Sequence, residues 1–161
     1  MQQSLKALLE RLLAHEIDFV LIGGFAAAVH GSTLVTQDID ICTAITEDGV
    51  AKLRNALKDL HPWHRMNPTA KLSFIEHPAD IRGINNIYLK TDFGVLDILS
   101  QVSPAGDFAA IKSRSIEIPL YGHRCRVISI EDLIRVKEAM NRPKDQLAVQ
   151  ELKLIQQRTK V

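Results

Sequence analysis

Residues 19–42, FVLIGGFAAAVHGSTLVTQDIDIC, run from an apolar segment through two glycines to a pair of acids. Because side chains alternate between the two faces of a β-strand, Asp38 and Asp40 in Asp38-Ile39-Asp40-Ile41 are expected to share one face. Two carboxylates side by side repel each other, and a divalent cation removes that repulsion and also binds phosphate. The pattern predicts a metal site on a strand; the alternative is a solvated edge strand with its acids turned outward.

A third acid, Asp97, interrupts the apolar run GVLDIL of residues 94–99. A charge inside an apolar strand costs several kcal/mol unless it is paired or bound to a metal. Asp97 is therefore the best candidate for a third ligand from a neighbouring strand. The alternative is that Asp97 faces solvent on a sheet with only one covered face.

Gly23 and Gly24 follow the first apolar run and precede the alanine-rich segment. Glycine lets a ligand approach the backbone closely, and the free N–H groups at a helix start favour anions. The pair predicts a phosphate-binding turn. Glycine pairs are common in loops, so a simple strand-to-helix turn remains the alternative.

The order of apolar patterns along the chain predicts a mixed α/β (α+β) fold of one domain. Thr46 and Ser129 are expected to cap helices, and Pro143 to open the last one. Residues 61–68 hold two prolines and are expected to form a loop. Helices are predicted over 1–15, 25–30, 47–60, 108–114, 129–140 and from 143 onward, and strands over 19–22, 36–43, 71–75, 84–90, 95–99, 115–120 and 124–128.

Composition excludes several classes of protein. The formal net charge of +1 gives no bulk electrostatic signal for nucleic acid or for an anionic membrane. No apolar run has the length of a transmembrane helix, and the first residues lack the layout of a signal peptide. Cys42 and Cys125 lack metal-ligand spacing and are expected to be reduced thiols. We therefore expect a cytoplasmic protein that makes no membrane contact.

These motifs occur in a specific combination: an apolar run, a glycine pair, thirteen intervening residues, an Asp-x-Asp between apolar residues, and a later strand acid. The combination resembles the DNA polymerase beta superfamily of nucleotidyltransferases, with the match on Gly23, Gly24, Asp38, Asp40 and Asp97. The tail from Ser129 through Lys137 to Arg142-Pro143-Lys144-Asp145 resembles a small bacterial subgroup that includes abortive-infection nucleotidyltransferase toxins. Residues 60–84 match no pattern of the family.

The resemblance implies a nucleotidyltransferase fold, with a central mixed β-sheet flanked by helices and a C-terminal helical pair. It implies a single domain over 1–161, with a core at about 16–128 and the C-terminal helices at about 129–159. The implied reaction moves a nucleoside monophosphate from a nucleoside triphosphate such as ATP to a hydroxyl and releases pyrophosphate. The acceptor, whether protein, RNA or a small molecule, is left open.

The resemblance also implies roles for particular residues. Asp38 and Asp40 would coordinate two Mg²⁺ ions, with Mn²⁺ as a substitute, and Asp97 would bind the catalytic ion and help to deprotonate the acceptor. The turn at Gly23-Gly24, with Thr36, would hold the phosphates.

Three basic residues of the tail are candidates to contact the triphosphate or the acceptor, by point charge or by forked hydrogen bonds. Basic residues are also favoured at exposed helix ends by the helix dipole, which is the alternative here. The three are Lys137, Arg142 and Lys144.

One position departs from the subgroup. Its members often carry an arginine two residues before the threonine of the Thr-x-Asp-x-Asp motif, and this chain has Leu34 there, before Thr36. Loss of that arginine removes a charge-assisted phosphate contact. It is the only sequence support for a second hypothesis, an inactive or slow member that serves as an interaction or regulatory module in a toxin–antitoxin pair.

Overall fold

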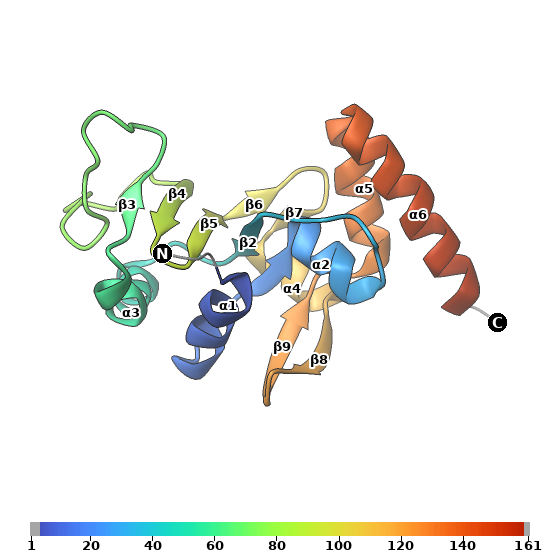
Figure 1. The fold of residues 1–161 in the computed structure, drawn as a ribbon, viewed down its shortest axis with the longest axis horizontal. Coiled ribbons are helices and arrows are strands. Elements are labelled where there is room, and N and C mark those ends of the chain that lie inside the picture. Colours follow the sequence, from blue (N-terminus) through green and yellow to red (C-terminus); the bar gives the residue numbers. More distant parts are fainter. Residues whose placement is uncertain (1–3, 160–161) are drawn as a thin grey trace.

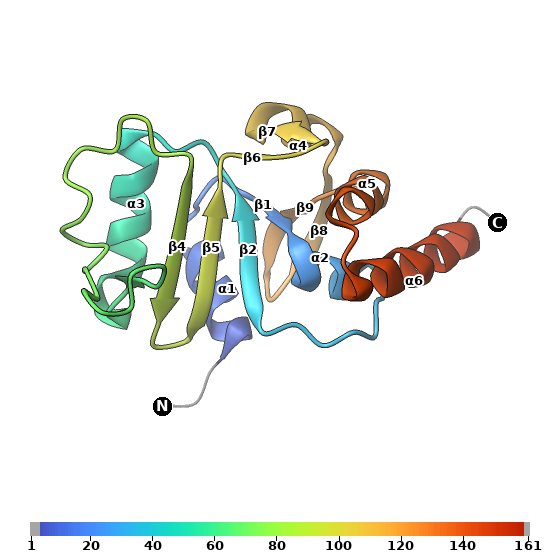
Figure 2. The same cartoon turned by 90° about the horizontal axis from the view of Figure 1, so that it is seen from above.

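The computed structural model describes residues 4–159, which form a twisted sheet with helices packed around it (Figures 1 and 2). The helices are α1 (Leu5–Ala14), α2 (Gly23–His30), α3 (Glu47–Leu57), α4 (Phe108–Arg114), α5 (Ile130–Met140) and α6 (Pro143–Thr159), with a 3₁₀ turn at Lys58–Leu60. The strands are β1 (Val20–Ile22), β2 (Asp38–Cys42), β3 (Trp63–His64), β4 (Asn86–Thr91), β5 (Gly94–Leu99), β6 (Gln101–Val102), β7 (Gly106–Asp107), β8 (Ile116–Leu120) and β9 (His123–Val127).

Seven of the strands form one mixed sheet in the order β3-β4-β5-β2-β1-β9-β8. β2 is parallel to β5 and antiparallel to β1, and β1 is parallel to β9. The order places β2, which carries the two acids, at the centre beside β5 rather than at an edge. A mixed central sheet with a C-terminal helix pair confirms the predicted fold class.

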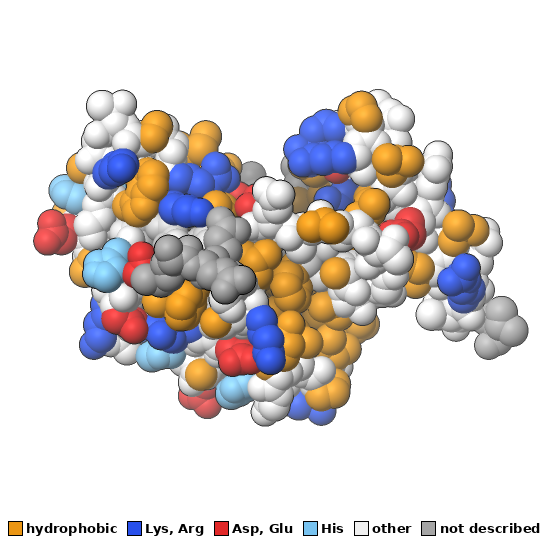
Figure 3. Space-filling view, in the orientation of Figure 1, with side chains coloured by type: hydrophobic (Ala, Val, Ile, Leu, Met, Phe, Trp, Pro, Cys, Tyr) orange, Lys and Arg blue, Asp and Glu red, His pale blue; other side chains and the backbone are white. Residues whose placement is uncertain are grey.

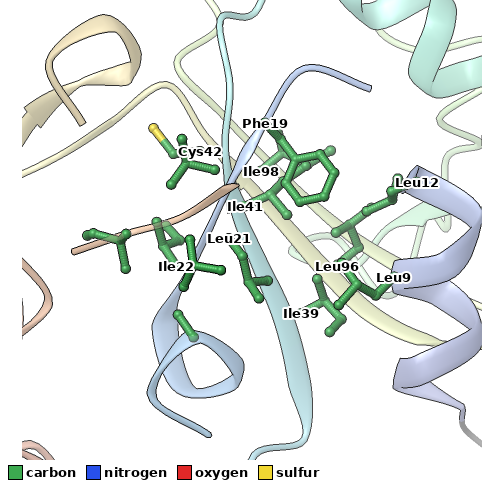
Figure 4. Close-up of a cluster of buried hydrophobic side chains, with 14 of the residues drawn as sticks. Leu9, Leu12, Phe19, Leu21, Ile22, Ile39, Ile41, Cys42, Leu96 and Ile98 are labelled. Atoms are coloured by element: carbon green, nitrogen blue, oxygen red, sulfur yellow. The ribbon is translucent and has the colours of Figure 1, made fainter. Parts of the chain in front are cut away.

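The face of β2 opposite the acids packs into the hydrophobic core against α1. Ile39 and Ile41 of β2 are completely buried, and Leu9 and Leu12 of α1 point toward them across the interface (Figure 4). Full burial of a side chain of this size stabilises the fold by about 1.5–3 kcal/mol. The alternation in Asp38-Ile39-Asp40-Ile41 therefore fixes which face of β2 meets α1, and leaves both acids on the other face.

The predicted helix starts are confirmed where their caps can be checked. The Thr46 hydroxyl accepts a hydrogen bond from the backbone N–H of Gly49, and the Ser129 hydroxyl accepts one from that of Asp132. Each bond satisfies an N–H group that has no partner within its own helix. The helix expected over 1–15 is observed from Leu5, and its first three residues lie outside the described part of the chain.

Two predictions in the segment before β4 are wrong. Residues 71–75 form no strand, and only Ser73 makes an isolated bridge, to Trp63. The apolar signal there arises from Phe74, which is fully buried while its carbonyl accepts a hydrogen bond from the Arg54 guanidinium at 2.7 Å. Conversely, the predicted loop over 61–68 contains the short strand β3.

The small sheet of β6 and β7 was also not predicted from the sequence. Each of these strands is two residues long, which is too short to show a periodic pattern.

α5 and α6 form a helix pair beside α2, at the end of the sheet order that holds β9 (Figures 1 and 2). Between Ser4 and Thr159, no helix combines the length and apolar character needed to cross a membrane.

Candidate active site

The two acids of β2 and the acid of β5 meet on the open face of the sheet. In the parallel register of these strands Asp40 lies directly opposite Asp97, and Asp38 lies opposite Val95. Directly opposed residues on neighbouring strands point to the same face, so all three carboxylates face the same cleft. Asp97 is 8% exposed and lies in the cleft floor, which excludes the solvent-facing alternative.

The row of acids continues across the sheet to two residues with no sequence signal. Tyr88 of β4 lies opposite Asp97, and the backbone N–H of Arg65 donates a hydrogen bond to the Tyr88 carbonyl at 3.1 Å. The Arg65 side chain binds Asp97 through two hydrogen bonds, Nε to Oδ1 at 3.0 Å and Nη2 to Oδ2 at 2.6 Å. Arg65 belongs to the 60–84 segment, where no pattern indicated a role.

Burial and neighbouring negative charges strongly shift the pKa of Asp40. Burial, together with the nearby carboxylates of Asp97 and Asp38, raises the pKa of Asp40 to about 6, against the opposing charges of Lys137 and Arg65. A carboxyl group in this state is stabilised by any added positive charge. Its surroundings therefore favour a cation.

The donor set fits a divalent cation in part. Asp38 and Asp40 supply hard carboxylate oxygens of the kind that Mg²⁺ prefers, and no ion pair within residues 4–159 occupies either of them. Asp97 differs, because both of its oxygens are engaged by Arg65. In this arrangement no three acidic, histidine or cysteine side chains of the described chain converge closely enough to hold a metal ion. Asp38 and Asp40 thus fit the ion, and Asp97 does not while Arg65 holds it.

The glycine pair is required by the side chains of Thr36 and Asp40, which lie just before and within β2. A Cβ on Gly23 would lie 2.2 Å from the Oδ2 atom of Asp40, and the positive φ of +70° disfavours any other residue there. A Cβ on Gly24 would lie 2.8 Å from the Thr36 hydroxyl oxygen. That hydroxyl donates a hydrogen bond to the Asp38 carbonyl at 3.2 Å. Gly23 and Gly24 are thus the first two residues of α2 rather than a separate turn before it, and this start of the helix packs directly on Asp40 and Thr36.

The basic tail residues line the opposite wall. Arg142 binds Asp145 through Nε at 2.5 Å, and the Lys137 ammonium lies 3.8 Å from the same carboxylate. Burial lowers the pKa of Lys137, although Asp145 and Asp40 act in the opposite direction. Asp145 lies in the first turn of α6, where the helix dipole also favours a negative charge. Arg142 is thus committed to a structural pair, while Lys144 faces the cleft beside it.

All the predicted site residues line one cleft of about 800 Å³. In Figure 3 a notch separates the sheet from the C-terminal helices, with basic side chains on both sides of it. Leu34 lies at its rim and is 43% exposed, so this position, where the sequence resemblance leads us to expect an arginine, does face the cleft. The residues brought together are Gly23, Gly24, Thr36, Asp38, Asp40, Asp97, Lys137, Arg142 and Lys144.

Comparison with known proteins agrees with this architecture. No protein-family model matches the sequence, and no curated protein matches it. Among solved structures, the lincosamide antibiotic adenylyltransferase LnuA, solved with lincomycin bound, superposes with a TM-score of 0.62 at 18% identity, over 92% of this chain and 94% of LnuA. This chain has the nucleotidyltransferase fold.

Two further structures support the same conclusion. The antibiotic-resistance factor ANT(2″)-Ia, solved in complex with adenylyl-2″-tobramycin, matches with a TM-score of 0.55 at 13% identity over 93% of both chains. A Thermotoga maritima protein provisionally assigned as a nucleotidyltransferase matches with a TM-score of 0.56 at 15% identity, over 91% of this chain and 88% of its own. At such identities the likeness establishes the fold and leaves the chemistry to the residues of the site.

Proposed function

We propose that this chain is a metal-dependent nucleotidyltransferase that moves a nucleoside monophosphate from a nucleoside triphosphate to a hydroxyl acceptor. The observation that carries the proposal is the register of β2 on β5, which sets Asp40 beside Asp97 with Asp38 on the same face of the cleft. Acids placed so closely are costly to a fold unless a cation or a substrate uses them.

The reaction is a displacement at the α-phosphorus of the donor. The acceptor oxygen forms a bond to the α-phosphorus, the bond from that phosphorus to the oxygen bridging the α- and β-phosphates breaks, and pyrophosphate leaves with the electron pair. The hydroxyl proton passes to a carboxylate of the cleft. A Mg²⁺ or Mn²⁺ ion held by Asp38 and Asp40 supplies charge neutralisation for the phosphate oxygens.

The chain's own groups position the donor between two walls of the cleft. Gly23 and Gly24 begin α2 directly against Asp40 and Thr36, and the backbone N–H groups of this first helical turn would bind phosphate. On the other wall, Lys137 and Lys144 provide point charges for the triphosphate, whereas Arg142 acts mainly by holding Asp145. Asp97 lies on the side of the row away from these lysines, where an acceptor hydroxyl would enter.

The test is transfer of label from each of the four α-labelled nucleoside triphosphates, with Mg²⁺ and a cell extract as the source of acceptor. We expect labelled acceptor with the natural protein and none with Asp38→Ala or Asp40→Ala. Asp48→Ala, which removes an exposed acid on α3 outside the cleft, is the matched control and should retain transfer. Undiminished transfer by both cleft variants would refute the metal role.

A second candidate is an interaction or regulatory module of a toxin–antitoxin pair that has lost turnover. Two observations favour it: the cleft rim carries Leu34 at the position where the sequence resemblance leads us to expect an arginine, and Arg65 forms an ion pair with Asp97. Binding of labelled nucleotide with and without Mg²⁺ separates the candidates. Metal-enhanced affinity supports the enzyme, and equal binding in both conditions supports the module.

A further inference from the structure

Arg65 is held on the acid row from several sides. Besides its two hydrogen bonds to Asp97, its guanidinium lies 5.4 Å from the centre of the Tyr88 ring, and Nη1 donates to the sulfur of Met66 at 3.5 Å. The hydrogen bond from its backbone N–H to the Tyr88 carbonyl fixes its Cα beside β4. Bidentate pairing of this kind is both strong and geometrically specific. These contacts therefore hold the Arg65 side chain in a fixed position beside Asp97.

The charges of the row show what this arginine does there. Three carboxylates of the sheet face the cleft, those of Asp38, Asp40 and Asp97, and Arg65 is the one basic side chain among residues 4–159 that forms an ion pair with any of these three. Its pairing with Asp97, helped by the charges of Asp38 and Asp40, raises the pKa of the guanidinium, so it stays charged. One acid is thereby neutralised, and two remain. Two negative charges match one divalent cation.

A metal ion at Asp97 would have to displace this guanidinium. Displacement breaks two charge-assisted hydrogen bonds and the stacking on Tyr88, and leaves a cation next to another cation. Hydrogen bonds to a charged group are among the stronger ones in proteins, and the contact of the guanidinium with the aromatic ring adds to them. Among residues 4–159, no basic side chain forms an ion pair with Asp38 or Asp40 that a metal ion would have to displace.

We propose that Arg65 occupies the cation position at Asp97, so that this chain takes a single divalent cation, at Asp38 and Asp40, where a three-acid site would take two. The inference rests on the proposed function only in that Asp38 and Asp40 bind a metal. Arg65 is on this account a positioning residue: it holds Asp97 in place and supplies one positive charge on the acceptor side of the cleft.

The experiment counts Mn²⁺ ions bound per chain, using the full-length protein and the electron paramagnetic resonance signal of free Mn²⁺. We expect one ion for the natural protein, two for Arg65→Met, and one for Arg65→Lys, which keeps the charge. Arg82→Met is the matched control, because Arg82 belongs to the same segment but pairs with Asp80 and does not line the cleft. It should leave the count at one.

The outcomes separate this inference from the proposed function. A count of two for the natural protein overturns the inference by itself, even if the variants fail to fold, and leaves a metal-dependent enzyme in place. A count of one for both the natural protein and folded Arg65→Met overturns the role of Arg65 alone. Absence of any bound Mn²⁺ overturns the metal-dependent function and the inference together.

Discussion

Asp145 and Asp40 are both shielded carboxylates that line the same cleft, yet their surroundings differ in charge. Asp145 is 1% exposed and pairs with Arg142 and Lys137. Burial alone would raise the pKa of Asp145, but the hydrogen bonds from Arg142 hold it below its ordinary value. Asp40 has two carboxylates near it, and its pKa is raised to about 6 by burial and by Asp97 and Asp38.

Asp132 of α5 extends the comparison. Its side chain is 3% exposed and pairs with Arg114 at 2.7 Å and Arg135 at 3.2 Å. Asp132 and Asp145, the two buried acids of the helix pair, thus have two cations each, whereas within residues 4–159 the three cleft acids of β2 and β5 have one ion-paired cation among them. An acid with matched charge holds structure together. An acid left short of positive charge destabilises the fold, and its persistence is explained when a ligand supplies the missing charge.

The largest effect is expected from removing a matched acid. Asp145→Ala leaves Lys137, which is mostly buried, without its partner. Breaking a buried pair from one side destabilises a protein by about 3–5 kcal/mol, and urea unfolding should show a loss in this range. Glu131→Ala, at an exposed acid of α5, is the control and should change stability by about 0.5 kcal/mol or less. Equal losses of stability in both variants would contradict the view that an acid with ion-pair partners stabilises the fold more than an exposed acid does.

Removing an unmatched acid should act in the opposite direction. In metal-free protein at pH 7, Asp40→Asn is expected to raise the free energy of unfolding, because it deletes a charge that burial and neighbouring acids disfavour. At about 1.4 kcal/mol per pKa unit, the gain has a ceiling of about 3 kcal/mol. Urea unfolding in the presence of a chelator measures it, with Asp48→Asn as the control. A clear loss of stability would show that Asp40 is matched after all.

The pH dependence of the same difference gives a smaller and more specific signal. The folded-state pKa of Asp40 is raised from 3.8 to about 6, so the folded protein binds this proton more tightly than the unfolded chain. The resulting stability is fully present below pH 3.8 and is lost as pH rises to about 6. Within that window, the free energy of unfolding of the natural protein should therefore decrease relative to that of Asp40→Asn by at most about 1.4 kcal/mol per pH unit. A constant difference from pH 3.5 to 7 contradicts the raised pKa.

The smallest effect concerns the rim. Leu34→Arg places an added cation at the mouth of the cleft, where the acids lack positive charge and a phosphate would enter. One charge-assisted contact on a partly exposed wall suggests an increase in affinity for inorganic tripolyphosphate of about three- to tenfold. Leu72→Arg, at a leucine that is 41% exposed and does not line the cleft, is the matched control. An equal gain in both variants would assign the effect to net charge rather than to position.

Much of this architecture was predictable from local patterns. The alternation around Asp38 and Asp40, the caps at Thr46 and Ser129, and the hairpin between β4 and β5 depend on neighbours within a few residues, which the sequence displays directly. The 60–84 segment was not predictable in the same way. Its strand β3 is two residues long, and Phe74 is buried without belonging to a strand, so neither follows a period of 2 or 3.6.

The sequence by itself identified the acids, the glycine pair and the basic residues of the tail as candidates for the site. It also determined that the two acids of β2 share one face of their strand. Only the tertiary structure decided how charge is shared among them, because ion pairs join residues far apart in the chain. Arg65 reaches Asp97 across 32 positions through the register of β4 on β5, and Gly23 is needed because Asp40 approaches it from the next strand. The sequence motif identifies the three acids, and the fold determines which of them have no ion-pair partner and are available to bind a metal.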